Sequence, residues 1–447
     1  MFSSVLIANR GEIARRIIRA CRSLGIRAIA VYSEADAGWP FVAEADQAVA
    51  IGPAPARDSY LSVERILEAA RRTGAEAIHP GYGFLSESWR FAKACEEAGL
   101  VFIGPPWRVI QQMGDKVGAR RLMASAGVPI VPGSDGPVDS VEGARGLAAR
   151  IGYPIIIKAA AGGGGIGMVK VSDEGALAAA FASAQRRAAA AFGSTDLFVE
   201  RFLEAPRHIE VQVFGDRLGQ VVHLHERECS IQRRHQKLIE ESPAPNLPAK
   251  LKTRLTAAAV TGAKAVGYVN AGTVEFMVKA DRFYFLEMNT RLQVEHPVTE
   301  EVTGFDLVQA QIQVAAGEPV PWRQESIVQR GASMECRIYA EDPTKGFLPA
   351  PGRVSRLVLP EGPGIRVECG VAEGVDVSVH YDPLLAKLVV AGATRDEALG
   401  RMRSALDGFV VAGVKTVIPF HQRVIASAAF SAGSVHTQMV AEGAFNG

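Results

Sequence analysis

The sequence predicts an α/β and α+β multidomain fold, with a doubly wound parallel sheet first, a central domain around a glycine-rich loop next, and a mixed α+β domain last. Three observations lead to this prediction. The chain has 447 residues, which is too many for a single hydrophobic core. Strand and helix patterns alternate up to about residue 113. A glycine run between two apolar strands, followed by an acidic strand pair, marks a second domain of a different kind.

The first part of the chain alternates short apolar runs with helical spacing. Strands are expected at Val5 to Asn9, Ile26 to Ser33, 75–81 and Val101 to Gly104, and helices at Gly11 to Leu24, Leu61 to Thr73 and Glu87 to Ala98. This rhythm is typical of a parallel, doubly wound sheet. Its first turn, NRGEIA, has one glycine and does not match G-x-G-x-x-G, so no NAD site is predicted.

The rest of the chain divides at the turn-rich segment VPIVPGSDGPVDS, residues 128–140. Beyond it we expect a strand, glycine loop and strand over 151–171, and an alanine-rich helix at about 174–192. Strands follow at 196–203, 207–215, 220–230, 272–278 and 283–289, with a helix at 250–266. From about residue 330, short strands at 332–341, 352–359 and 365–370 and a helix at 396–406 predict a mixed α+β domain.

Composition limits the possible functions. Hydrophobic residues make up 48% and charged residues 22% of the chain, which is typical of a folded globular protein. A net charge of +1 argues against a nucleic-acid partner. No stretch is long enough to span a bilayer, and the apolar run from Val5 to Ala8 is too short for a signal peptide. Five scattered cysteines without a C-x-x-C pair predict reduced thiols in a cytoplasmic protein.

The glycine loop follows Lys158 in the segment IIIKAAAGGGGIGM. Four consecutive glycines (Gly162, Gly163, Gly164 and Gly165) and then Gly167 allow the backbone amides to turn toward one anion. The P-loop pattern is absent, and a flexible linker is the alternative interpretation. Because linkers rarely lie between two strands, we favour a lid that closes over phosphate.

The segment GTVEFMVKADRFYFLEMN reads as a hairpin centred on Asp281. Glu275 and Glu287 are each six positions from that centre, so they would oppose one another on one face. Two opposed carboxylates on a buried sheet repel one another unless a cation is present. Together with Asn289 they offer the oxygen ligands that suit Mg²⁺ or Mn²⁺. The alternative is an exposed hairpin with solvated acids.

Polar residues occupy every second position from the end of this hairpin onward: Glu287, Asn289, Arg291, Gln293 and Glu295. In an extended chain all five would project to the same side. Arg291 has the planar donor fork that holds an oxyanion, and Glu295 beside it would act as a general base. His296, which precedes a proline, is interpreted as structural.

A basic run lies within ERECSIQRRHQKLIEESPAP and contains Arg227, Arg233, Arg234, His235 and Lys237. Glutamates are mixed into it and no aromatic residue interleaves it, so a nucleic-acid patch is disfavoured. We expect cations placed to receive anionic substrates.

Eight segments, in order, closely resemble biotin carboxylase of the ATP-grasp superfamily. They are ANRGEIA, HPGYGFLSE, MGDKVGAR, IIIKAAAGGGGIGM, VERFLEAPRHIEVQV, ERECSIQRRHQKLIEESPAP, EMNTRLQVEHPVTE and ECRIYAEDP. The likeness runs from about residue 2 to 440. It implies a Rossmann-like N-terminal domain at 1–113, an ATP-grasp domain at 114–329 with a lid at about 131–203, and a C-terminal biotin carboxylase domain at 330–447.

The resemblance implies a ligase that uses MgATP and bicarbonate to carboxylate biotin through carboxyphosphate. ATP would be bound by Lys116, Lys158, Glu200, Leu203, His208, Gln232 and His235, with the glycine loop as lid. The metal, Mg²⁺ or Mn²⁺, would be held by Glu275, Glu287 and Asn289. Bicarbonate would be held by Lys237, Arg291, Gln293 and Val294, with Glu295 as base. Arg337 would stabilise the biotin enolate.

The resemblance also implies partners. No Met-Lys dipeptide, of the kind that carries biotin, occurs in the sequence. We therefore expect a stand-alone subunit that works with a separate biotin carboxyl carrier protein and with carboxyltransferase subunits. The resemblance alone implies a homodimer of the acetyl-CoA carboxylase type, which would serve fatty acid synthesis. Ile166 and Tyr339 depart from the residues common in that type. The alternatives are a subunit of another acyl-CoA or pyruvate carboxylase, a different ATP-grasp ligase, and a non-catalytic scaffold.

Overall fold

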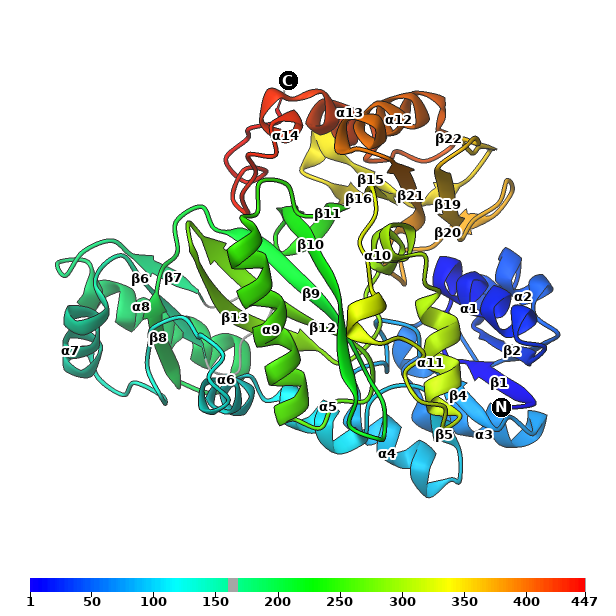
Figure 1. The fold of residues 1–447 in the computed structure, drawn as a ribbon, viewed down its shortest axis with the longest axis horizontal. Helices are drawn as coiled ribbons and strands as arrows, with labels where there is room; N and C mark the ends of the chain where they lie inside the picture. Colours follow the sequence, from blue (N-terminus) through cyan, green and yellow to red (C-terminus); the bar gives the residue numbers. More distant parts are fainter. Residues whose placement is uncertain (160–167, 447) are drawn as a thin grey trace.

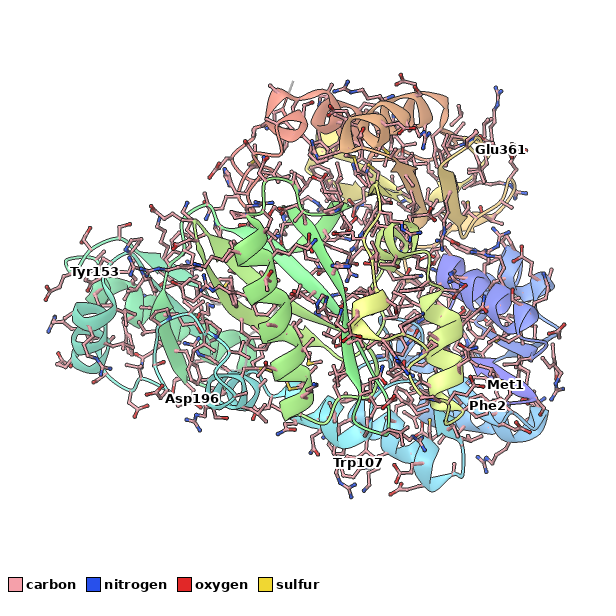
Figure 2. The ribbon with its side chains drawn as sticks, in the orientation of Figure 1. Met1, Phe2, Trp107, Tyr153, Asp196 and Glu361 are labelled. Atoms are coloured by element: carbon pink, nitrogen blue, oxygen red, sulfur yellow. The ribbon has the colours of Figure 1, made fainter. Side chains whose placement is uncertain are left out.

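The computed structural model describes residues 1–159 and 168–446 (Figure 1). The predicted glycine lid, from Gly162 to Gly165 and at Gly167, lies outside the described residues, as does Ile166. Figure 2 places Tyr153 and Asp196 in a small outer unit and Glu361 in the C-terminal part, with Trp107 on the segment that leads toward the outer unit.

The N-terminal part is a parallel sheet in the order β3-β2-β1-β4-β5, which confirms the doubly wound prediction. Its strands are β1 (Ser4–Ile7), β2 (Arg27–Tyr32), β3 (Gln47–Ala50), β4 (Ala77–His79) and β5 (Val101–Phe102), and its helices are α1 (Gly11–Ser23), α2 (Pro40–Glu44), α3 (Val63–Thr73) and α4 (Trp89–Glu97). The whole of β1 is buried, because helices cover both faces of the sheet. The half-exposed β3 was not predicted, since its short QAVA run has no distinct period.

A small antiparallel sheet forms the outer unit seen on the left of Figure 1, with the strand order β7-β6-β8. Its strands are β6 (Ile155–Ala159), β7 (Val169–Val171) and β8 (Leu197–Arg201), and α7 (Val141–Ile151) and α8 (Leu177–Phe192) pack with them. The helices α5 (Trp107–Gly114) and α6 (Lys116–Ser125) join this unit to the N-terminal sheet. The glycine loop thus connects two strands of one sheet, as predicted.

An eight-stranded antiparallel sheet dominates the rest of the chain, in the order β13-β12-β9-β10-β11-β14-β21-β19. Its strands are β9 (Arg207–Gly215), β10 (Val221–Arg233), β11 (Gln236–Ser242), β12 (Asn270–Lys279), β13 (Arg282–Asn289), β14 (Ala332–Tyr339), β19 (Ile365–Cys369) and β21 (Leu384–Gly392). The sheet runs without a break past residue 330, so the central and C-terminal parts share one hydrogen-bonded surface.

Helices cover this large sheet on both sides (Figure 1). The long α9 (Ala249–Ala265) packs on β9 and β10, and α10 (His296–Thr303) packs on β10, β11, β14 and β21. The remaining helices are α11 (Leu307–Ala315), α12 (Arg395–Gly408), α13 (Ile418–Ala426) and α14 (Ala428–Ser431). Short strands edge the C-terminal part: β15 (Glu341–Asp342), β16 (Leu348–Pro349), β17 (Gly352–Arg353), β18 (Arg356–Val358), β20 (Asp376–Val377) and β22 (Val410–Ala412).

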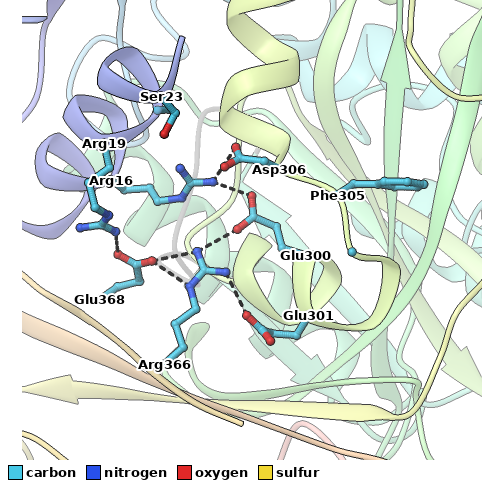
Figure 3. A pocket seen from close by; sticks show the side chains of 11 residues that line it. Arg16, Arg19, Ser23, Glu300, Glu301, Phe305, Asp306, Arg366 and Glu368 are labelled. Carbon is cyan, nitrogen blue, oxygen red and sulfur yellow. Dashed lines mark hydrogen bonds and ion pairs between the residues drawn. The ribbon is translucent and has the colours of Figure 1, made fainter. Parts of the chain in front are cut away.

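An ion-pair network ties three parts of the chain together around an open polar cavity of about 540 Å³ (Figure 3). Arg16 on α1 lies 2.8 Å from Glu300 on α10 and 2.7 Å from Asp306, which caps α11. Arg366 on β19 bridges Glu300 and Glu368, each at 2.8 Å. These ion pairs join the N-terminal helix α1, α10 and β19, so the network fixes the C-terminal end of α10.

All five cysteines are buried and free, which agrees with the prediction of reduced thiols. Among the helices that the structure describes, none is both long enough and apolar enough to cross a membrane.

Candidate active site

The acidic hairpin places Glu275 on β12 directly opposite Glu287 on β13, as predicted. The turn is tighter than expected, because Lys279 pairs with Arg282 and Phe276 with Phe285. If this register continued unchanged away from the turn, Glu275 would lie opposite Leu286. A β-bulge adds one residue to β13 at that point and returns Glu287 to the position opposite Glu275. The bulge therefore sets the carboxylate pair.

The prediction that the polar row continues as an extended strand to Glu295 is wrong. β13 ends at Asn289, Arg291 and Gln293 lie on the following loop, and Glu295 is the N-cap residue of α10. The side chains still converge, because they share hydrogen bonds. Asn289 and Gln293 each donate to Glu275 Oε1 at 2.9 Å, and Arg291 donates to Asn289 Oδ1 at 2.8 Å.

Lys237 is the centre of the buried charge. Its ammonium, on β11, donates to three carboxylates: Glu210 at 2.5 Å, Glu275 at 2.8 Å and Glu295 at 2.7 Å. Burial opposes ionisation of Glu275, yet Lys237 and His208 together lower its pKa below its usual range. Glu275 is therefore ionised, and its ion pair with Lys237 helps to fix that ammonium among the three carboxylates.

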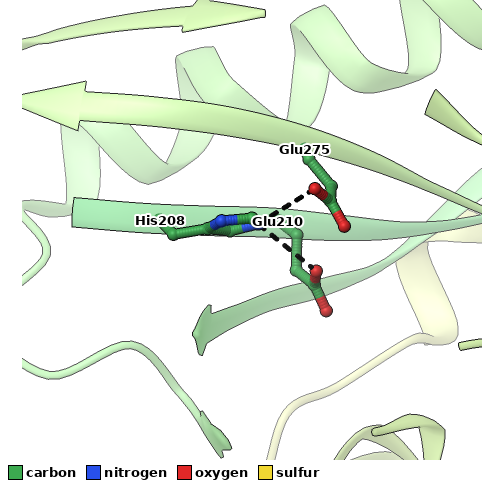
Figure 4. A group of neighbouring side chains, drawn as sticks. All are labelled: His208, Glu210 and Glu275. Carbon is green, nitrogen blue, oxygen red and sulfur yellow. Dashed lines mark ion pairs between the residues drawn. The ribbon is translucent and has the colours of Figure 1, made fainter. Parts of the chain in front are cut away.

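His208 lies beside this group (Figure 4). Its Nε2 is 3.2 Å from Glu275 and 3.8 Å from Glu210. Burial lowers the pKa of His208, but Glu275 outweighs that effect and raises it. The set His208, Glu210 and Glu275 has metal-ligand chemistry, but Lys237 already pairs with both of its carboxylates and Arg227 pairs with Glu210 as well. The predicted metal set shares Glu275 with this group and adds Glu287 and Asn289, which have fewer cations beside them.

The oxygens of Glu275, Glu287 and Asn289 suit Mg²⁺ or Mn²⁺. Glu287 is 43% exposed, and burial together with Glu275 raises its pKa, as expected for a carboxylate pair lacking enough positive charge. Lys116 Nζ, at the start of α6, lies 3.7 Å from Glu287. A cavity of about 130 Å³ is lined by Glu87, Lys116, Glu287 and Asn289 among others, so two of the three predicted metal ligands, Glu287 and Asn289, border open space, whereas Glu275 is buried behind them.

Glu295 lies between two cations. Arg337 on β14 donates from Nη2 to Glu295 at 2.9 Å and from Nε to Glu240 at 2.6 Å. Its Nη1 donates to the Tyr339 hydroxyl at 3.4 Å. Burial disfavours the ionised form of Glu295, but Lys237 and Arg337 hold its pKa well below its usual range. Burial raises the pKa of Glu240 to about 7, which Arg337 only partly offsets.

The predicted ATP-binding residues are divided between the two sheets. Lys158 on β6 and Glu200 on β8 form an ion pair at 2.5 Å in the small sheet. Gln232 is buried near the end of β10, and His235 is exposed in the β10–β11 turn with a φ of 68°. Leu203 is half-buried just after β8.

Val294, which was predicted to help hold bicarbonate, accepts a hydrogen bond from Lys387 through its carbonyl oxygen at 2.8 Å.

Two contributors were missed by the sequence analysis. Glu87, from the N-terminal part, accepts from Arg291 Nε at 2.9 Å and from the Thr290 amide at 3.0 Å. Glu210 pairs with Arg227 at 2.5 Å, and neither side chain is exposed. Glu210 could have been found, because His208, Glu210 and Gln212 alternate with apolar residues in RHIEVQV and therefore share a face.

The basic run does not act as one substrate-facing patch. Arg227 is fully buried and donates to Glu210, Gln212, Thr273 and Thr299. Arg233 pairs with Glu341 at 2.9 Å. Within this run, Lys237 alone is bonded to both Glu275 and Glu295.

Replacing Arg227 by methionine is expected to lower the free energy of unfolding by about 3–5 kcal/mol. The substitution leaves the buried polar partners of Arg227 on two strands, β9 and β12, and on α10 without their donor. Chemical denaturation measures the change. The control is Arg57→Met, since Arg57 is 84% exposed and pairs with its exposed neighbour Asp58; its effect should stay within about 0.5 kcal/mol. Equal effects for the two variants would contradict a structural role for Arg227.

Three family models match the chain in order. "Biotin carboxylase, N-terminal domain" matches residues 1–110, "Carbamoyl-phosphate synthase L chain, ATP binding domain" matches 115–323, and "Biotin carboxylase C-terminal domain" matches 335–442. An ATP-binding domain of this kind, set between these two flanking domains, makes the chain an ATP-grasp enzyme of the ligase class.

Relatives extend this result over the whole length. A biotin carboxylase of Halalkalibacterium halodurans is 53% identical, over 98% of this chain and 97% of that protein. A pyruvate carboxylase subunit of Methanothermobacter thermautotrophicus is 52% identical, over 99% and 90%. The alpha subunit of the mitochondrial methylcrotonoyl-CoA carboxylase of Arabidopsis thaliana is 54% identical over 98% of this chain but 60% of its own length. The chain belongs to the biotin carboxylase family.

A solved structure has the same fold. The biotin carboxylase domain dimer of Hydrogenobacter thermophilus 2-oxoglutarate carboxylase, in complex with MgADP, ADP and bicarbonate, has a TM-score of 0.93 and is 48% identical. The match covers 100% of this chain and 99% of that one. That relative therefore binds magnesium nucleotide and bicarbonate on the fold found here.

Proposed function

We propose that this chain carboxylates carrier-bound biotin, using MgATP and bicarbonate and passing through carboxyphosphate. The observation that carries the proposal is the placement of Glu295. It lies between Lys237 and Arg337, and Lys237 also contacts Glu275 of the predicted metal pair. The proposed base, two cations and one carboxylate of the proposed metal pair thus belong to one connected group of side chains. The complex of the related domain with MgADP and bicarbonate supports the same assignment.

Bicarbonate would bind between Arg291, Lys237 and Gln293, which carry hydrogen-bond donors beside Glu295. The anion would take over the hydrogen bond that Lys237 now gives to Glu295. With fewer donors, Glu295 gains proton affinity and removes the bicarbonate proton. The resulting oxygen attacks the γ-phosphorus of ATP, ADP leaves, and carboxyphosphate forms. A divalent ion held by Glu275, Glu287 and Asn289 would neutralise charge on the phosphates.

Carboxyphosphate then breaks down to CO₂ and phosphate, and the phosphate takes the proton from N1′ of biotin. The negative charge that develops on the ureido oxygen needs a fixed cation. Arg337 fits this role, because Glu240 and Glu295 hold its guanidinium from two sides and the Tyr339 hydroxyl lies near its third nitrogen. The biotin nitrogen attacks CO₂ and gives carboxybiotin.

ADP release tests the proposal. The purified chain should release ADP faster when MgATP, bicarbonate and free biotin are all present than when either bicarbonate or biotin is left out. A rate of ADP release that does not depend on biotin would contradict biotin as the acceptor and favour another ATP-grasp ligase.

Replacing Glu287 by glutamine is expected to raise the Mg²⁺ concentration for half-maximal activity by at least about tenfold, because a charged oxygen ligand is lost. A titration of ADP release with Mg²⁺, and separately with Mn²⁺, measures the shift. Glu97→Gln is the control, since Glu97 is 64% exposed on α4 and pairs with Lys93. An unchanged Mg²⁺ dependence in Glu287→Gln would contradict the metal assignment.

The family leaves several carboxylation systems open. We propose that the carboxyl group passes to a separate biotin carboxyl carrier protein and then, through carboxyltransferase subunits, to acetyl-CoA in fatty acid synthesis. The relatives named for pyruvate and methylcrotonoyl-CoA support a second candidate, a subunit of another acyl-CoA or pyruvate carboxylase. We also propose a homodimer, as in the related dimeric domain. The domain limits 1–113, 114–329 and 330–447 remain predictions.

A further inference from the structure

Lys387, in the middle of β21, is a buried charge with no assigned role. Its side chain is 0% exposed. In the register of the sheet it lies opposite Arg337 on β14 and opposite Glu368 on β19, so the three share one face, beneath α10. An ammonium is costly to bury unless it is paired and hydrogen-bonded. Its partners therefore indicate why it is there.

Lys387 has partners from both other parts of the chain. Its Nζ donates to the carbonyl oxygen of Val294 at 2.8 Å. It also lies 3.2 Å from Oε2 of Glu12, near the start of α1, and 5.8 Å from the ring centre of Tyr82. The side chain thus joins the C-terminal part to the N-terminal helix and to the loop that carries the proposed bicarbonate site.

The bond to Val294 acts on the catalytic base through the peptide link. The Val294 carbonyl and the Glu295 amide belong to one planar peptide unit. A hydrogen bond that holds the Val294 oxygen therefore also restricts the orientation of the Glu295 backbone nitrogen and Cα. Glu295 has no regular strand or helix turn before it, because the preceding residues form a loop and Glu295 itself caps α10. A fixed peptide is therefore needed to aim its carboxylate between Lys237 and Arg337.

We propose that Lys387 is a positioning residue for Glu295, which it aligns through the Val294 carbonyl, with Glu12 as its counter-charge. This inference rests on the proposed function. It differs from a purely structural role, in which Lys387 and Glu12 would only neutralise one another. In the positioning role the bond to Val294 matters for turnover, whereas in the structural role only the balance of charge matters.

Two variants separate these roles. Lys387→Met alone leaves Glu12 buried without its cation, so it should lose both stability and turnover. The double variant Lys387→Met with Glu12→Met removes both charges and should recover most of the melting temperature. If Lys387 positions Glu295, the double variant should still turn over on the order of 10–100-fold more slowly than the wild type, with a raised KM for bicarbonate and a KM for ATP within about twofold.

The experiment measures melting temperature and the kinetics of ADP release with MgATP, bicarbonate and biotin for the wild type and both variants. Lys252→Met is the matched control, because Lys252 also pairs with a buried glutamate, Glu226 at 3.0 Å, but lies away from the loop that holds Val294. Its KM for bicarbonate should be unchanged. A crystal structure of the double variant should show the Val294 carbonyl and Glu295 displaced.

Wild-type turnover in the double variant, or an undisplaced Val294 and Glu295 in its crystal structure, would overturn the inference. Failure of the proposed function has a different signature: the wild type itself would release ADP without regard to biotin. The crystal structure tests the alignment by Lys387 even in that case.

Discussion

Replacing Glu295 by glutamine is expected to lower biotin-dependent turnover by about 10²–10⁴-fold, the usual contribution of a positioned general base. Glutamine has nearly the same shape, so the space between Lys237 and Arg337 stays filled. It cannot accept the bicarbonate proton, and its neutral amide no longer balances the two cations. Steady-state ADP release and a single-turnover measurement of ATP cleavage should both show the loss.

The matched control for this prediction is Glu301→Gln. Glu301 lies on the same helix, α10, but at its other end, where it pairs with Arg366 at 3.1 Å. Its variant should keep turnover within about twofold. A Glu295→Gln enzyme with more than a tenth of wild-type turnover would rule out Glu295 as the base. The melting temperatures of both variants show whether a loss reflects chemistry or unfolding.

Replacing Arg337 by methionine is expected to lower biotin-dependent turnover on the order of 10²–10³-fold, while ATP affinity changes by less than about twofold. Arg337 is the cation that Glu240 and Glu295 hold in a fixed orientation. A fixed cation stabilises a developing negative charge without reorganising, so its loss affects the carboxylation step most. Calorimetric titration with ATP and ADP-release kinetics with biotin separate the two effects.

The chain offers a close control for the loss of a buried Arg–Glu pair. Arg395 pairs with Glu241 at 2.7 Å, on the same strand as Glu240. Arg395→Met should lose stability in a similar way but keep biotin-dependent turnover at temperatures where it is folded. Equal loss of turnover in the two variants would show that Arg337 acts only through the fold.

The fold was largely predictable because its strong signals are local. Apolar runs such as VLIAN and helical spacing between them are sufficient for a parallel sheet, and the chain follows that pattern. The hairpin shows the limit of such arguments. Counting from Asp281 gave the correct pairing of Glu275 with Glu287, although the turn was tighter than expected, because a β-bulge added the missing residue. No feature of the sequence indicated that bulge.

The candidate site was predictable where its residues are close in sequence. Asn289, Arg291, Gln293 and Glu295 are spaced by two, and they do converge, although through hydrogen bonds on a loop rather than along a strand. Lone polar residues from distant segments gave no local signal. Glu87 reaches Arg291 across 204 positions and Lys387 reaches Val294 across 93. Arg337 entered only through the resemblance to a known family.

The most direct test of the central claim is the transfer of radiolabelled carbon from bicarbonate to free biotin. The purified chain is incubated with MgATP, labelled bicarbonate and biotin, and the product is assayed as acid-labile carboxybiotin. We predict label in biotin in amounts that match the ADP released above the biotin-free background, and none when ATP is left out. ADP release without any label in biotin would contradict the assignment of biotin as the acceptor.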